Sequence, residues 1–182
     1  KKLEAALTPE SRVFILGAGL IGLKCAEGIA RRVRSVEVAD LANQVLPSIL
    51  DEEGAKRVQA HLEKQGLTFH LGDTVARFSG NTATLQSGAS VNFDVLVLAV
   101  GVRPNVSLVQ DAGGRVERGV VIDSTGLTTL PDVYAAGDCC QSYDSTSGEN
   151  KVLALLPNAY FQGECAGKPM AGDASSFTRA MP

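Results

Sequence analysis

Apolar residues recur along this chain in short runs separated by segments with helical spacing. Residues 13–16 predict a buried strand, and the apolar positions after them predict a helix over residues 20–33. Residues 35–39 predict a second strand, residues 51–66 a second helix, and residues 67–71 a third strand. Strands that alternate with helices in this order are typical of a parallel sheet with helical crossovers. We therefore expect an α/β fold with a doubly wound parallel sheet.

The pattern changes after residue 71. Short runs over residues 74–78, 82–86 and 90–92 are separated by Ser, Gly and Asn turns, which predicts an antiparallel β-meander rather than another crossover. The apolar run over residues 94–100 then predicts a central strand that returns to the parallel sheet.

The second part of the chain is rich in loops. Residues 120–122 predict a short strand, and residues 128–138 predict a loop that enters a buried strand. A polar Ser/Thr/Gly loop is expected over residues 141–151, and a last helix from Pro157 to about Ala166. The expected divisions are a lead-in at 1–11, a nucleotide-binding domain at 12–105, a second segment at 106–172 and a tail at 173–182.

Three glycines join the first predicted strand to the first helix. Gly17, Gly19 and Gly22 have the G-x-G-x-x-G spacing of a dinucleotide-binding turn in a Rossmann-like fold. The first glycine permits a tight turn, the second lets the backbone approach a pyrophosphate, and the third lets the helix pack closely on the strand. Backbone amides at the helix start bind phosphate without a cationic side chain. The residues expected to bind the dinucleotide here are Gly17, Ala18, Gly19, Leu20, Ile21 and Gly22.

Asp40 closes the second predicted strand, 18 positions after Gly22. An acidic residue at about this distance accepts hydrogen bonds from the adenosine ribose in dinucleotide-binding folds. A 2′-phosphate would meet this carboxylate as a like charge, and residues 41–50 contain no Arg or Lys to offset it. The sequence therefore favours NAD(H) over NADP(H). The alternative is that Asp40 serves only as a turn residue at the strand end.

Two further positions are candidates for ligand contact. Pro104 disfavours helix at Arg103, so Gly101 is expected to present bare backbone at the carboxyl edge of the sheet. Asp138 follows the sequence Ala-Ala-Gly at the end of a predicted strand. This position suits a hydrogen bond to a ligand hydroxyl, and it equally suits an aspartate that only initiates a turn.

Composition and charge exclude several partners. The 182 residues are 45% apolar, with a net charge of −3 and a pI of about 5.4, so nucleic acid and anionic membrane surfaces are not expected partners. No apolar run approaches the roughly 20 residues that span a bilayer, and we expect a cytoplasmic protein. The four cysteines lack C-x-x-C spacing and a histidine cluster, so no metal site is predicted. We expect these thiols to be reduced, because adjacent Cys139 and Cys140 form a disulphide only in a strained ring.

Together these motifs resemble the flavin-dependent pyridine nucleotide-disulphide oxidoreductase family, which includes NADH oxidases and coenzyme A disulphide reductases. The resemblance runs from about Ser11 to Gly172 and rests on the glycine turn, Asp40, and the sequences at residues 99–105 and 133–138. It implies that the glycine turn, Asp40 and Gly101 line an NAD(H) site. It also implies that Gly137 and Asp138 contact FAD, and that the helix after Pro157 points its start at the isoalloxazine ring.

Two departures limit what the resemblance implies. The family carries its own FAD-binding Rossmann half, with a separate glycine motif, and usually an interface domain; neither is found in this sequence. The resemblance thus describes an NAD(H)-binding domain at 12–105 and the returning segment of an incomplete FAD domain at 106–172, without tightly bound flavin. The second departure is Lys24, where many members have a glutamate that orients the nicotinamide carboxamide. Lysine donates to a carboxamide oxygen but cannot accept from its amide.

The function implied for the intact protein is hydride transfer from NADH to FAD and then to an unknown acceptor. Expected partners are NADH, the missing FAD-domain half and that acceptor, and a homodimer is left open. The cofactors carry the chemistry, so the sequence assigns no catalytic acid, base or nucleophile, and the isolated chain is expected to be inactive. The alternative is a non-catalytic NAD-sensing module. A methyltransferase that binds S-adenosylmethionine is disfavoured by the inserted meander.

Overall fold

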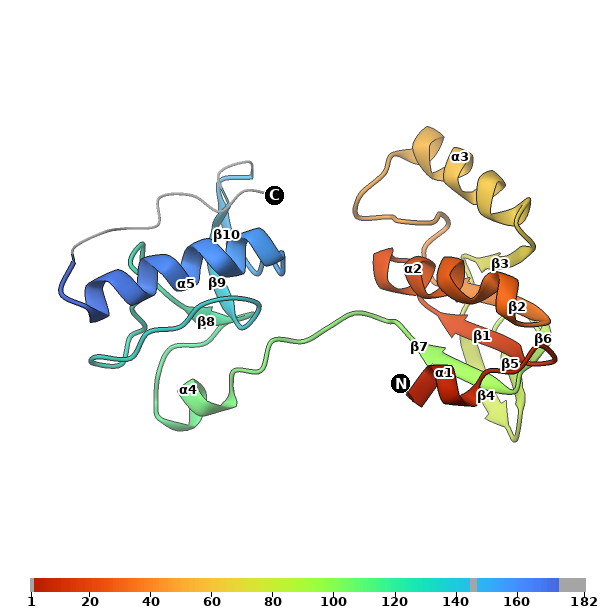
Figure 1. The fold of residues 1–182 in the computed structure, drawn as a ribbon, viewed down its shortest axis with the longest axis horizontal. Coiled ribbons are helices and arrows are strands. Elements are labelled where there is room, and N and C mark those ends of the chain that lie inside the picture. The colour runs from red at the N-terminus through yellow and green to blue at the C-terminus, as the bar shows by residue number, and fades with distance from the viewer. Residues whose placement is uncertain (1, 145–146, 174–182) are drawn as a thin grey trace. The chain divides into compact units, whose positions relative to one another are not determined.

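The computed structural model describes residues 2–144 and 147–173. The chain divides into two compact units, Lys1–Gly101 and Val102–Pro182 (Figure 1). Within these described residues, the first unit contains a parallel sheet, an antiparallel sheet and three α-helices, and the second contains a small sheet and two α-helices.

The first unit is built on a four-stranded parallel sheet with strand order β3-β2-β1-β7. Its strands are β1 (Arg12–Leu16), β2 (Ser35–Asp40), β3 (Leu67–Leu71) and β7 (Val95–Leu98). The strands pair in parallel, so all four carboxyl ends lie at the same edge. The expected return to the parallel sheet is confirmed. The expected central position is wrong, because within the described ranges β7 pairs only with β1 and therefore forms an edge.

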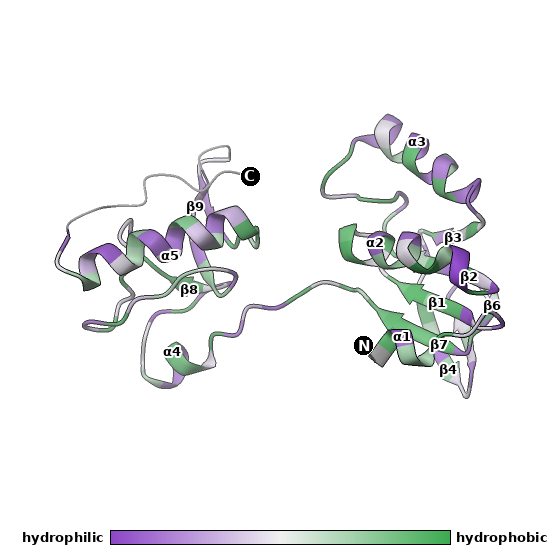
Figure 2. Cartoon of the chain, in the orientation of Figure 1, coloured by the Kyte–Doolittle hydropathy of each residue, from purple (hydrophilic) through white to green (hydrophobic). Residues whose placement is uncertain are grey.

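Helices cover one face of this sheet. They are α2 (Leu20–Ile29) and α3 (Glu52–Glu63), and a short α1 (Lys2–Ala6) precedes the first strand. The β-strand alternation places Val13 and Ile15 in the same buried cluster as Leu23 and Leu62 of the two helices. Figure 2 shows the hydrophobic strands beneath helices that carry hydrophilic residues.

Helix α2 is shorter than expected. It ends at Ile29 and continues as a 3₁₀ turn over Ala30–Arg32, rather than as α-helix to residue 33. The backbone amide of Arg34 already donates to the carbonyl of Ser11 at 2.9 Å, so the chain must leave the helix before it enters β2.

The antiparallel meander covers the other face. It consists of β4 (Val75–Ser79), β5 (Thr82–Leu85) and β6 (Ser90–Asn92), in the order β4-β5-β6. Phe14 of β1 is fully buried against residues of the meander, among them Leu85 and Val91. A Rossmann-like α/β fold with an inserted meander is thereby confirmed.

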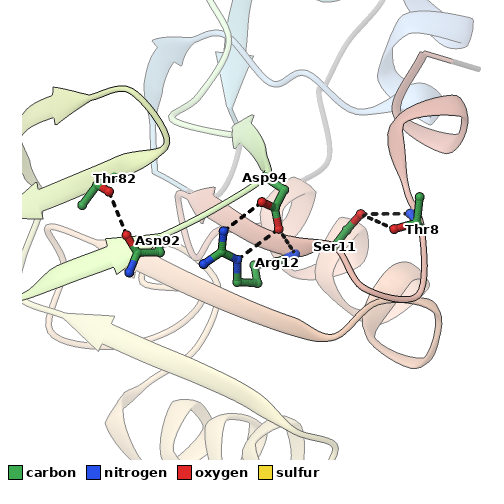
Figure 3. A network of polar contacts seen from close by, with 6 residues as sticks. All are labelled: Thr8, Ser11, Arg12, Thr82, Asn92 and Asp94. Carbon is green, nitrogen blue, oxygen red and sulfur yellow. Dashed lines mark hydrogen bonds and ion pairs between the residues drawn. The ribbon is translucent and has the colours of Figure 1, made fainter.

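Polar contacts join the start of β1 to the segment between β6 and β7, and another links two strands of the meander (Figure 3). Asp94, which precedes β7, accepts hydrogen bonds from the guanidinium of Arg12 at 2.9 and 3.0 Å and from the Arg12 backbone amide at 2.8 Å. These bonds hold the pKa of Asp94 at about 2, below its ordinary value. Thr82 donates to Asn92 at 2.7 Å and joins the last two strands of the meander.

The second unit contains α4 (Ser107–Asp111), β8 (Val120–Val121), β9 (Cys140–Asp144), β10 (Glu149–Lys151) and α5 (Leu156–Met170). Strand β9 lies in the middle of the sheet, parallel to β8 and antiparallel to β10. Helix α5 buries one face, and Ala166 on that face closely approaches Gly126, which lies between β8 and β9.

Three expectations for this unit are wrong. The strand predicted before Asp138 is not formed, because Tyr134 makes only a single β-bridge, to Leu127. The strand begins instead at Cys140, after Asp138. In place of the loop predicted over 141–151, β9 and β10 pair antiparallel within the described residues. Buried positions of β9 are polar, which hid the strand pattern. Helix α5 extends beyond Ala166 to Met170. Pro169 has no amide to donate, but the amides of Ala171 and Gly172 donate to carbonyls of the last turn.

Candidate functional site

The glycine turn between β1 and α2 is fixed by close backbone contacts. Gly17 has φ of +108°, and a Cβ there would lie 2.3 Å from the carbonyl oxygen of Ala99. A Cβ on Gly22 would lie 1.9 Å from the carbonyl oxygen of Gly17. By contrast, a Cβ on Gly19 would meet nothing within 4 Å. Two of the glycines are therefore required by the protein's own packing, and the third lies on an open side of the turn.

The start of α2 presents free hydrogen-bond donors. Across the described residues, no protein acceptor is found for the backbone amides of residues 19–22, whereas the amide of Leu23 donates to Gly19. Amides of a first helical turn point out of the helix end and carry its partial positive charge. The side chains of Leu20 and Ile21 are 55% and 61% exposed. This arrangement suits an anion that approaches at Gly19.

Asp40 uses both of its carboxylate oxygens on backbone amides. Its Oδ2 accepts from the amide of Ala18 at 2.6 Å, and its Oδ1 accepts from the amide of Ala42 at 2.8 Å. Each oxygen has a second lone pair, so a ligand hydroxyl can still donate to this half-buried carboxylate. The spacing in the sequence predicted a ribose contact but gave no signal that Asp40 fastens the glycine turn. The sequence also contained no signal for Leu46, whose backbone amide donates to the carbonyl of Ala18 at 2.9 Å.

The sheet order creates a switch point beside this turn. From β1 the chain runs to β2 and β3 on one side, and β7 pairs with β1 on the other. Ligands of open α/β sheets bind outside the carboxyl ends of the strands at such a point. Gly101 follows β7 there with φ of +103°, and a Cβ on it would meet no atom within 4 Å. The structure thus places the glycine turn, Asp40 and Gly101 at one edge of the sheet.

Lys24 lies on the surface of α2. Its ammonium contacts Glu27 at 2.9 Å, and its side chain is 71% exposed. Together with Leu20 it lines a cavity of about 350 Å³ between α2 and α3. A salt bridge between exposed partners contributes little to stability, so this contact holds Lys24 only weakly.

Gly137 and Asp138 lie in the second unit, on a turn held against α5. Gly137 has φ of +85°, and its amide donates to Oε1 of buried Gln162 at 2.8 Å. Gln162 also donates to Ser142 at 3.1 Å, which joins α5 to β9. The carboxylate of Asp138 accepts no hydrogen bond from any residue the structure describes. It is exposed and lines a cavity of about 600 Å³ with Val102, Arg103, Pro104, Asn105, Arg118, Cys139, Lys151, Val152 and Ala154.

The four cysteines, Cys25, Cys139, Cys140 and Cys165, are free thiols. The sulfur atoms of Cys139 and Cys140 are 3.6 Å apart, and burial strongly raises the pKa of Cys140 above its ordinary value. Within residues 2–144 and 147–173, no group of three or more His, Cys, Asp or Glu side chains is placed to hold a metal. In those same ranges, no helix is long and apolar enough to cross a membrane.

Comparison with known proteins gives consistent matches. Residues 1–163 match the family described as "Pyridine nucleotide-disulphide oxidoreductase". The chain is 35% identical over 170 residues to an NADH oxidase of Methanocaldococcus jannaschii, covering 91% of this chain and 38% of that protein. An NAD-dependent persulfide reductase from A. fulgidus has the same fold, with a TM-score of 0.90 and 26% identity, over 97% of this chain and 33% of that one.

A third match is an FAD-dependent pyridine nucleotide-disulphide oxidoreductase from Desulfovibrio vulgaris, with a TM-score of 0.87 and 29% identity, over 93% of this chain and 45% of that one. The chain therefore spans less than half the length of these three relatives. The relatives are oxidoreductases, and the family uses NAD(H) and FAD. The matched residues and the shared fold show that this chain belongs to the pyridine nucleotide-disulphide oxidoreductase family.

Proposed function

We propose that this chain is the NAD(H)-binding part of a flavin-dependent oxidoreductase that passes hydride from NADH to FAD and on to an acceptor. The observation that carries the proposal is the 2.6 Å contact between Asp40 and the amide of Ala18. It holds a ribose-binding carboxylate directly beside the free amides of residues 19–22. The chain spans less than half the length of these relatives.

The residues of the first unit fit a dinucleotide. The amides of residues 19–22 bind the pyrophosphate, and the open side of Gly19 lets it approach the backbone. Asp40 accepts hydrogen bonds from the adenosine ribose. Each of these bonds contributes about 1.5–3 kcal/mol to binding, because the acceptor is charged. Gly101 leaves room beside β7 for the rest of the ligand. The bound nicotinamide supplies the hydride chemistry.

Asp40 also sets the choice of coenzyme. A 2′-phosphate would be repelled by a carboxylate whose position is fixed by two backbone amides. Residues 41–50 supply no Arg or Lys to neutralise that repulsion. The proposed coenzyme is therefore NADH rather than NADPH.

The second unit takes the role of the returning FAD segment. Its exposed Asp138 carboxylate, free of protein hydrogen bonds within the described ranges, is available to a hydroxyl of the ribityl chain. Gly137 keeps that carboxylate in place through its bond to Gln162 of α5. A complementary FAD-domain half would hold the remainder of FAD, and the electrons would pass from the flavin to an acceptor.

Isothermal titration calorimetry with NADH, NADPH and S-adenosylmethionine tests the proposal. NADH should bind most tightly and S-adenosylmethionine should not bind. Tighter binding of NADPH would contradict the role of Asp40, and binding of S-adenosylmethionine alone would contradict the proposed function.

A further inference from the structure

We propose that Leu46 is a positioning residue for the nucleotide site. Its backbone amide fixes the peptide group between Ala18 and Gly19, and thereby aims the Gly19 amide at the pyrophosphate of NADH. This inference rests on the proposed function and adds a residue outside the glycine turn on which binding depends. Leu46 and the glycine turn both belong to the first unit, so their contact does not depend on how the two units are arranged.

Successive peptide groups of the glycine turn are held by different partners. The amide of Gly17 donates to the carbonyl of Ala39 at 2.8 Å, and the amide of Ala18 donates to Asp40 at 2.6 Å. Both of these acceptors lie at the end of β2. The next peptide group begins with the carbonyl of Ala18, and its partner comes from farther along the chain, at Leu46.

This peptide group contains both the acceptor for Leu46 and a donor for the ligand. The carbonyl of Ala18 and the amide of Gly19 lie in one plane, and in a trans peptide they point in opposite directions. Leu46 donates to that carbonyl at 2.9 Å, and no other hydrogen bond to this peptide group is found among the described residues. The direction of the Gly19 amide is therefore set by Leu46.

The backbone of Leu46 is held in an unfavourable conformation. Its φ is +51°, in the left-handed region that a bulky side chain rarely adopts. Such strain persists only where the surroundings hold it, and it is concentrated at functional sites. Here the preceding Val45 is fully buried, and the carbonyl of Leu46 accepts from the amides of Ile49 and Leu50 at 2.9 and 3.0 Å. These contacts keep the Leu46 amide turned towards Ala18 before any ligand binds.

A preoriented Gly19 amide favours binding, because its orientation does not have to be fixed when the pyrophosphate arrives. Without the Leu46 donor, the peptide group between Ala18 and Gly19 could rotate, and ordering it would oppose binding. Asp40 cannot take over this role, since it holds the preceding peptide group. Loss of the Leu46 donor should therefore weaken NADH binding while the rest of the turn stays folded.

An amide-to-ester exchange at residue 46 tests the inference, because it removes the donor and keeps the leucine side chain. In the full chain, Leu46 is replaced by its α-hydroxy acid, and NADH binding is measured by calorimetry well below the melting temperature. The NADH affinity should fall about fivefold. The order parameter of the Gly19 amide in the free protein, measured by NMR relaxation, should fall as well. A matched ester at Ile49 removes another 2.9 Å backbone bond of the same segment and should leave both quantities unchanged.

The variant Leu46→Asn separates the backbone from the side chain. Asparagine adopts the left-handed conformation more readily and keeps the amide, so the NADH affinity should stay close to wild type even if the lost packing lowers the melting temperature.

Four results would each overturn the inference. They are wild-type NADH affinity in the residue 46 ester, an unchanged Gly19 order parameter, equal weakening by the Ile49 ester, and a Leu46→Asn variant as weak as the residue 46 ester. Failure of the proposed function would appear differently, as the absence of NADH binding by the wild-type chain.

Discussion

The carboxylate of Asp40 accepts a hydrogen bond from the backbone amide of Ala18 at 2.6 Å, so a strand end and the glycine turn are fixed to each other. Its other oxygen accepts from Ala42 at 2.8 Å. A residue that the sequence marks only as a ribose ligand therefore also shapes the surface that receives the pyrophosphate. The two roles are coupled through one side chain.

Replacing Asp40 should weaken NADH binding through both roles. We expect Asp40→Asn to lose about tenfold to a hundredfold in NADH affinity, since it removes a charged acceptor and one of the two amide contacts. The NADPH affinity should fall less, because the repulsion of the 2′-phosphate is removed at the same time. Calorimetry measures both affinities, with exposed Asp111→Asn as the control. An unchanged NADH affinity would contradict the assigned role.

Alanine substitutions in the glycine turn should distinguish a glycine needed for packing from one needed for NADH binding. Gly22→Ala forces a Cβ against the carbonyl of Gly17 and should lower the melting temperature. Gly19→Ala should leave the melting temperature unchanged, because its Cβ meets no protein atom, yet weaken NADH binding by blocking the pyrophosphate. Gly28→Ala, in the same helix and equally open, is the control and should stabilise by about 0.5–1 kcal/mol. NADH affinity retained in Gly19→Ala would show that the ligand does not approach there.

The Arg12–Asp94 contact should make the free energy of unfolding depend on pH in the acidic range. The pKa of Asp94 is lowered to about 2 by hydrogen bonds from Arg12, so its contribution is present above its unfolded pKa near 3.8. It is lost as the pH falls through about 2. Asp94→Asn should therefore lower the urea midpoint at pH 7, and its difference from wild type should shrink below pH 4. A difference that stays constant over this range would contradict the assignment.

Gln162 should stabilise the second unit. It is buried and accepts from Gly137 while it donates to Ser142, so Gln162→Leu leaves polar groups unsatisfied and should cost about 1–3 kcal/mol. The chain has three tyrosines, Tyr134, Tyr143 and Tyr160, and no tryptophan, so tyrosine fluorescence reports unfolding of this unit. Exposed Glu164→Gln is the control. A variant with the wild-type urea midpoint would show that the Gln162 bonds contribute nothing.

Local spacing predicted the first unit well, because each of its signals lies within a few residues. The apolar run before Gly17 and the helical pattern after Gly22 identify β1 and α2 without reference to distant parts of the chain. The second unit was predicted less well. Its strand β9 buries polar residues, among them Gln141 and Asp144, whose partners come from other elements, so periodicity of apolar residues does not reveal it.

The candidate site shows the same division. The spacing of the glycines and the number of residues between Gly22 and Asp40 can be recognised in the sequence. The contact between Asp40 and Ala18 cannot, because it depends on how two strand ends meet. Likewise, Arg118 could not be assigned to the cavity from the sequence, since its place beside Asp138 follows from the pairing of β8 with β9.

The central claim is that NADH binds at the free amides of the glycine turn. It is tested most directly by two-dimensional amide NMR of the isotope-labelled chain during titration with NADH. We predict saturable shifts of the amide signals of residues 19–22, with little change at Gly137 and Asp138. Saturable binding that leaves the signals of residues 19–22 unmoved would contradict the account.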